Sequence, residues 1–145
     1  MVSAVVVKMG CVFCDIISGK IRSYGLYSDE YVVAILDINP ANPGHCLVIS
    51  KKHYTNILDA PPELLAHMII VAKKLSVALV EVLKADGINI IITNNRAAGQ
   101  TVMHLHIHVI PRFIGDGIRF KFRPKKLTED ELIDIRNRLS KVIAR

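Results

Sequence analysis

The sequence has no apolar run approaching the roughly 20 residues that a helix needs to cross a bilayer. It has only three cysteines, and this odd number argues against a closed disulfide framework. No repeat, low-complexity tract or linker divides the chain, and the apolar start at residues 1–7 lacks the basic segment that precedes a signal-peptide core. We therefore expect one intracellular, cytoplasmic domain without membrane contact, preceded by an extension over residues 1–10 that forms a strand or a tail.

The composition is that of a globular protein, with 51% hydrophobic and 22% charged residues among 145. This length suits one compact domain with its own core. The formal net charge of +6 favours anionic partners, phosphates first among them, although a solvated basic surface explains the same charge.

Short β-branched stretches between turn residues predict five strands, at 24–27, 31–36, 46–50, 88–93 and 102–110. A long helix is predicted from the Pro61-Pro62 start signal to about Ala85, and its apolar arc is wide enough to be buried on two sides. A capping box at 128–131 begins a last helix. This order predicts an α+β domain around an antiparallel sheet, with a long helix and a C-terminal helix.

The predicted strand 102–110 carries three histidines in strict alternation with apolar residues. Since side chains of a strand alternate between its faces, the imidazoles should share one face and the apolar side chains should enter the core. The histidines are His104, His106 and His108, and the apolar residues are Met103, Leu105, Ile107 and Val109. Such a row needs partners for its nitrogens, which favours a functional site over a structural role.

Two chemistries fit the row: metal coordination by neutral imidazoles, or nucleophilic attack of an imidazole nitrogen on phosphorus. The residues just before the strand favour the second, because amide and hydroxyl groups suit phosphate oxygens and a pure metal site would not need them. They are Asn94, Gly99, Gln100 and Thr101.

The stretch AGQTVMHLHIHVIPR at 98–112 resembles the signature of the histidine-triad (HIT) family. Residues 11–21 (CVFCDIISGKI) and 37–53 (DINPANPGHCLVISKKH) resemble the other two diagnostic blocks of its prokaryotic members, in the same order. The resemblance implies a HIT domain over 11–115 with an antiparallel sheet of about five strands. Residues 116–145 would then form a basic tail and a helix that packs on the domain.

The resemblance also implies roles for individual residues. His106 would be the nucleophile, supported by His104, His108 and a fourth histidine, His45, and Thr101 would lie near the phosphate and the leaving group. Asp37 would bind the ribose hydroxyls. The nucleobase would lie between four isoleucines, Ile17, Ile21, Ile35 and Ile38. The phosphates would contact the loop before the strand, at Asn94, Gly99 and Gln100. That loop is one residue shorter than in relatives and lacks a glycine, so Asn95 is the alternative to Asn94.

Cys11 and Cys14 form a CxxC pair, a spacing found in zinc sites but weak evidence alone. The same resemblance implies that His53 and His104 complete a Cys2His2 site. A closed site of this kind holds structural zinc, which would brace the N-terminal segment and leave His106 free. No organic cofactor is expected.

The leading hypothesis is a nucleotidyl hydrolase or transferase that cleaves at the α-phosphate of AMP conjugates, such as nucleoside phosphoramidates, through a nucleotidyl-histidine intermediate. The substrate would be a purine nucleotide, with adenosine favoured. A dinucleoside polyphosphate hydrolase and a non-catalytic nucleotide- or metal-binding regulatory protein are the alternatives. The resemblance implies a homodimer. Nucleic-acid binding through the basic stretch 119–126, which also carries Phe120 and Phe122, is a weaker possibility.

Overall fold

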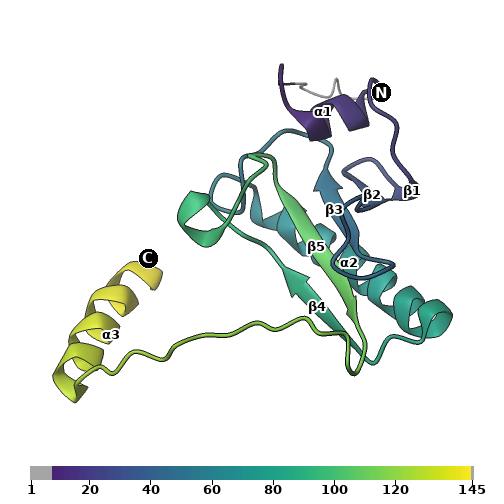
Figure 1. Ribbon diagram of the computed structural model, residues 1–145. Coiled ribbons are helices and arrows are strands. Elements are labelled where there is room, and N and C mark those ends of the chain that lie inside the picture. Colours follow the sequence, from purple (N-terminus) through teal and green to yellow (C-terminus); the bar gives the residue numbers. More distant parts are fainter. Residues whose placement is uncertain (1–7, 145) are drawn as a thin grey trace.

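A computed structural model describes residues 8–144 (Figure 1). The elements follow in the order α1 (Val12–Ile17), β1 (Gly25–Ser28), β2 (Val32–Leu36), β3 (Cys46–Ser50), α2 (Pro62–Leu83), β4 (Gly87–Ile91), the 3₁₀ turn η1 (Arg96–Ala98), β5 (His106–Arg112) and α3 (Glu129–Ile143). This confirms the predicted α+β class. No helix between residues 8 and 144 combines the length and the apolarity that crossing a membrane requires. Residues 1–7 of the expected extension over 1–10 lie outside the described residues.

The five strands form one antiparallel sheet in the order β1-β2-β3-β5-β4. One face is covered by α2, which buries a continuous apolar stripe against it (Figure 1). The core between them contains Val32, Ala34, Cys46, Val48, Met68, Val71, Ala72, Leu75, Leu79, Leu105, Ile107 and Val109. The opposite face is covered in part by α1, whose Phe13 and Cys14 join a second buried cluster with Ile35, Leu47 and Ile49. The functional side chains described below come from this second face.

The turn between β1 and β2 is tied to α2 through Asp29. Its carboxylate accepts hydrogen bonds from the backbone N–H groups of Tyr31 and Val32 at 2.8 and 2.9 Å and lies 2.6 Å from Nε2 of His67 on α2. Partial burial opposes ionisation, but these bonds prevail and lower the pKa of Asp29 to about 2. The hairpin is thereby held in place over the long helix.

Several predicted boundaries are wrong. Helix α2 ends at Leu83 rather than Ala85, because Lys84 adopts a left-handed conformation with φ of 58°. Strand β4 covers Gly87–Ile91 rather than 88–93. Strand β5 begins at His106 rather than 102, because the chain before it bonds elsewhere: the N–H of Leu105 donates to the carbonyl of Tyr54 at 2.7 Å, outside the ladder.

The predicted capping box of α3 is present, since the side chain of Thr128 accepts from the N–H of Glu131 and the side chain of Glu131 accepts from the N–H of Thr128. The expectation that α3 packs on the domain stays a prediction, because α3 is uncovered in the single chain. The helix has no buried residue, and Figure 1 shows it at the end of an extended segment, apart from the sheet. Its apolar residues Leu132, Leu139 and Val142 are 53%, 56% and 56% exposed.

Candidate functional site

Strand β5 presents two of the three alternating histidines on the sheet face away from α2. His106 pairs with Ile49 and His108 with Leu47, residues of the second buried cluster. On the other face, Ile107 and Val109 enter the core under α2, as the alternation predicted. His104 precedes the strand rather than lying in it as predicted. Its side chain points into a cluster with Cys11 and other ligand-type residues, as the family resemblance implied.

The imidazole of His106 is oriented by one short backbone contact. Its Nδ1 lies 2.6 Å from the carbonyl oxygen of His104. Because a carbonyl can only accept, Nδ1 carries the proton and donates it, which leaves a free lone pair on Nε2. Burial lowers the pKa of His106 below 6.5, against the opposing effect of the carbonyl, so the ring stays neutral at physiological pH. The result is a buried, neutral imidazole with a defined tautomer.

His45 and His108 form a second oriented pair. The backbone N–H of Ala41 donates to Nδ1 of His45 at 3.0 Å, so the proton of His45 is on Nε2, which donates to Nδ1 of His108 at 2.9 Å. His108 therefore carries its own proton on Nε2. Burial, aided by the neighbouring His106 and His45, lowers the pKa of His108 to about 4. Burial also lowers the pKa of His45, although Asp37, 3.5 Å away, opposes this shift.

The loop between β2 and β3 places His45 and Asp37 together. The N–H of Asp37 donates to the carbonyl of His45 at 2.9 Å, closing the loop at its base. Gly44 has φ of 97°, and a Cβ there would lie 2.5 Å from Cδ1 of Leu83, so the turn tolerates only glycine beside the end of α2. Asn42 fastens the loop to β5, since its Nδ2 donates to the carbonyl of Pro111 at 2.9 Å.

The four isoleucines predicted to contact a nucleobase differ in burial. Ile35 is buried in the second cluster and Ile17 packs against it, whereas Ile21 is 41% and Ile38 75% exposed. Two of them thus form a fixed apolar floor and two leave apolar surface in contact with solvent.

The loop before β5 is braced from within. The side-chain amide of Gln100 is buried and fully used: Nε2 donates to the carbonyls of Thr55 and Val102, and Oε1 accepts from the N–H of Asn95. The Gln100 side chain therefore holds the loop together, and its role toward a substrate stays a prediction. The side chain of Asn94 also bonds to the protein itself, because its Oδ1 accepts from the N–H of Ile57 at 3.0 Å. Gly99 and Thr101 are exposed.

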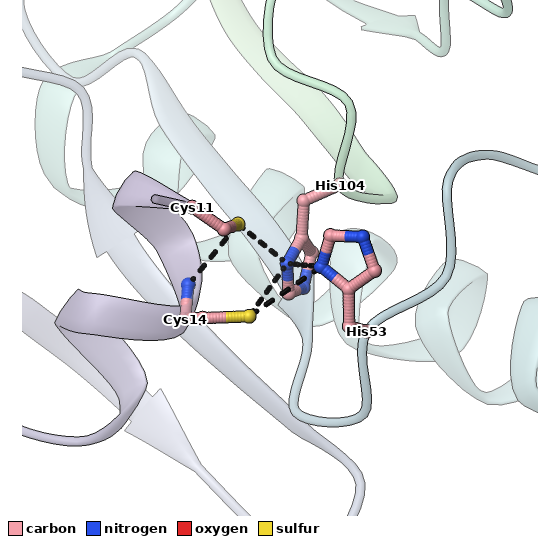
Figure 2. A group of neighbouring side chains, drawn as sticks. All are labelled: Cys11, Cys14, His53 and His104. Carbon is pink, nitrogen blue, oxygen red and sulfur yellow. Dashed lines mark hydrogen bonds between the residues drawn. The ribbon is translucent and has the colours of Figure 1, made fainter. Parts of the chain in front are cut away.

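A Cys/His cluster lies at the junction of α1, the segment after β3 and the segment before β5, as Figure 2 shows. It consists of Cys11, Cys14, His53 and His104, the set that the family resemblance implied. Sγ of Cys11 and Sγ of Cys14 lie 3.2 and 3.6 Å from Nδ1 of His104, Sγ of Cys14 lies 3.4 Å from Nδ1 of His53, and the two Nδ1 atoms are 3.0 Å apart.

These distances match a tetrahedral zinc site. Zinc bonds of about 2.3 Å to sulfur and 2.05 Å to nitrogen place S and N about 3.6 Å apart and two N atoms about 3.4 Å apart. The tautomer of His104 also fits, because its Nε2 lies 2.7 Å from the carbonyl of Ser50 and donates to it, which leaves a lone pair on Nδ1 for a metal. Nε2 of His53 is buried without a hydrogen-bond partner among the described residues, so an ion at Nδ1 would anchor that ring.

Three residues at the site were not predicted. Phe13, inside the CxxC pair, contacts the rings of both His104 and His106 with centroid separations of 5.8 and 4.9 Å. Ser50 orients His104, and Asn42 fastens the loop that carries His45. Their roles depend on contacts between distant segments, and no spacing in the sequence signals them.

The HIT domain family matches residues 18–115 of this chain. The chain belongs to the HIT family. A HIT-like protein of Methanocaldococcus jannaschii is 46% identical over 124 residues, covering 85% of this chain and 95% of that protein. An adenylylsulfatase of Arabidopsis thaliana is 42% identical over 102 residues, or 70% of this chain and 52% of that protein.

Solved HIT structures share the fold. A protein of Streptococcus mutans has a TM-score of 0.88 at 39% identity, covering 94% of this chain and 87% of that one. A zinc-bound HIT family protein of Mycobacterium smegmatis has a TM-score of 0.74 at 42% identity, covering 94% and 97%. The match confirms the HIT fold, with its five-stranded antiparallel sheet, long helix and C-terminal helix.

The histidine pKa values predict how the stability of this HIT protein depends on pH. Burial lowers the pKa of His45 and lowers that of His108 to about 4, whereas both take up protons near 6.5 once the chain unfolds. Between these pKa values the unfolded state binds more protons than the folded state. The contribution of these two histidines to the free energy of unfolding should therefore be complete above pH 6.5 and fall as the pH drops toward 4. Urea unfolding at several pH values measures this, and the NMR titration of His108 should show a midpoint far below 6.5. A midpoint at the ordinary histidine value would contradict it.

Proposed function

We propose that this protein is a nucleotidyl hydrolase or transferase that cleaves at the α-phosphate of AMP conjugates, with His106 as the nucleophile. The observation that supports this is the contact of 2.6 Å between Nδ1 of His106 and the carbonyl of His104. A neutral ring with its proton committed to a carbonyl presents Nε2 as the attacking atom without prior deprotonation. The adenylylsulfatase among the relatives supports the choice of adenylyl conjugates as substrates.

In the first step, Nε2 of His106 attacks the α-phosphorus, a P–N bond forms, and the bond to the leaving group breaks with its electron pair on that group. The ring becomes cationic while it keeps its Nδ1 proton, and the His104 carbonyl stabilises this charge. Water then attacks phosphorus and gives up a proton to the departed leaving group or to solvent, the P–N bond breaks, and its electron pair returns to Nε2. AMP is released and the neutral ring is restored.

The neighbouring groups would hold the nucleotide. The Nε2 proton of His108, fixed by the bond from His45, donates to a phosphate or leaving-group oxygen. Gly99 and Thr101 border the same exposed loop, where Thr101 offers a hydroxyl group near the leaving group. Asp37 accepts hydrogen bonds from the ribose hydroxyls. The nucleobase, adenine by preference, lies among Ile17, Ile21, Ile35 and Ile38, where exposed Ile21 and Ile38 can close over it.

Replacing the nucleophile tests this function. His106→Asn should lower turnover of a fluorogenic AMP conjugate by at least about a thousandfold, because no nitrogen lone pair remains to attack phosphorus. Steady-state kinetics with purified protein measure the loss. His67→Asn is the matched control, since His67 lies on α2 beside Asp29, and it should keep most of the activity. Turnover that survives in His106→Asn would refute the assignment, and binding of AMP without turnover in wild type would favour the regulatory alternative.

We further propose that the Cys/His cluster binds one structural zinc ion per chain. The four side chains fill a tetrahedral site and leave no open position, so the ion braces α1 against the segment before β5 and does not take part in the reaction. The zinc-bound relative from Mycobacterium smegmatis supports this choice of metal.

Metal analysis tests the zinc site directly. Wild type should contain close to one zinc per chain, and Cys14→Ser or His53→Ala should lose most of it, because each removes a ligand. Cys46→Ala is the control, since Cys46 is buried under α2, away from the cluster, and its loss should leave the zinc content unchanged. Equal zinc in wild type and Cys14→Ser would contradict this assignment.

We also propose a homodimer, because apolar side chains of α2 and α3 are uncovered in the single chain. On α2, Ile69, Ile70, Val77 and Val80 are between 46% and 54% exposed. On α3, an apolar stripe at Leu132, Leu139 and Val142 has no cover from its own domain. A second copy of the chain can cover both surfaces in one two-fold assembly.

Light scattering tests the dimer. Wild type should have twice the mass of one chain, and Leu132→Lys with Leu139→Lys should shift it toward the monomer, because the charges cannot be buried at an apolar contact. Asn137→Lys, on the opposite side of α3, should leave the dimer intact. A wild-type monomer would contradict the proposal.

A further inference from the structure

The ring of His106 contacts one residue of the Cys/His cluster and one residue that lies between the two cysteines in sequence. Its Nδ1 donates to the carbonyl of His104, whose side chain is part of that cluster. Its ring contacts Phe13, which lies between the two cysteines, with ring centroids 4.9 Å apart and planes at 69°. Phe13 also meets the ring of His104 edge-on, at 5.8 Å and 87°.

A histidine ring needs such support to keep its orientation. Rotation about the bond between Cβ and the ring is soft, with broad minima, so the backbone of β5 does not by itself fix the plane of the imidazole. One hydrogen bond to the His104 carbonyl restrains Nδ1 but allows the ring to tilt about that contact. The ring of His108 also contacts it, with a centroid separation of 5.0 Å and planes at 65°. The two ring contacts, with Phe13 and with His108, restrict this tilt.

Phe13 is itself held firmly. It is 7% exposed and belongs to the buried cluster that includes Cys11, Cys14 and Ile49. Its neighbours Cys11 and Cys14 point into the Cys/His cluster, so any group that ties the cluster together also fixes Phe13 (Figure 2). The position of the ring is therefore set by a short segment whose two ends are anchored at one point.

We propose that Phe13 is a positioning residue for His106: anchored by the Cys/His cluster, its ring keeps the imidazole in the orientation in which Nδ1 donates to His104 and Nε2 faces the substrate. The CxxC segment then has two roles. It stabilises the N-terminal region, and through Phe13 it orients the attacking Nε2 of His106. The inference rests on the proposed function of His106.

The test compares Phe13→Leu and Phe13→Ala with wild type, as full-length proteins whose zinc content is measured. Nitrogen-15 NMR of the imidazoles reports the tautomer of each histidine. In wild type, His106 should show a protonated Nδ1 and a lone pair on Nε2; in both variants the two nitrogen signals should move toward averaged values. With the AMP conjugate, kcat should fall between about 10- and 100-fold while KM changes less than about twofold, because orientation is lost and binding is kept.

Val12→Ala is the matched control, because Val12 lies in the same CxxC segment but is 40% exposed and makes none of the ring contacts described for Phe13. It should leave both the His106 signals and kcat unchanged. If Phe13→Ala loses zinc, Phe13→Leu decides, since it keeps an apolar side chain in the cluster. A Phe13→Leu protein with full zinc content, a single wild-type His106 tautomer and kcat within about twofold of wild type would overturn the proposal.

The NMR readout separates this inference from the proposed function. Were wild type unable to turn over any AMP conjugate, the nucleophile assignment would fail, yet the tautomer of His106 in Phe13→Leu would still show whether Phe13 orients the ring.

Discussion

The hydrogen bond from Nδ1 of His106 to the carbonyl of His104 is the contact on which the site depends. It fixes the tautomer, directs the lone pair of Nε2 outward and can stabilise positive charge on the ring. The bond exists because the chain leaves the sheet ladder just before β5, where Leu105 bonds to Tyr54. In a regular strand that began at residue 102, the His104 carbonyl would be directed along the sheet ladder and not at the ring of His106. The irregular start of β5 is thus part of the site.

The two faces of the sheet divide structural and functional roles. Under α2 the sheet buries aliphatic side chains such as Val48, Ile107 and Val109, and this layer supplies most of the core. On the opposite face, cover from α1 is incomplete, and the histidines of β5 lie beside Leu47 and Ile49. Burial there is deep enough to keep the imidazoles neutral, since His108 has a pKa of about 4. A rigid apolar layer behind the strand therefore supports reactive groups in front of it.

Much of the fold followed from local patterns. The β1–β2 hairpin, β3, the long helix and the capping box of α3 lie within a few residues of their predicted positions, because each has a strong periodicity or a clear start signal. The errors fall where long-range contacts override local preference. Strand β5 starts late because of a bond to Tyr54. Long-range contacts also turn the side chain of Gln100 inward, because Thr55 and Val102 offer carbonyls. The contacts of α3 are not decided within one chain, because none of its residues is buried there.

The sequence by itself determined the alternation of β5, the CxxC pair and the blocks that mark the family. These are properties of short segments, and the resemblance of the blocks to the family added His53 and His104 to the cysteine pair. Only the tertiary structure decided which nitrogen of each histidine carries a proton, that the backbone carbonyl of His104 orients His106, and that Phe13 contacts both rings. Such features depend on groups far apart along the chain that meet within a few ångströms, and hydrogen-bond direction and ring packing act only at that range.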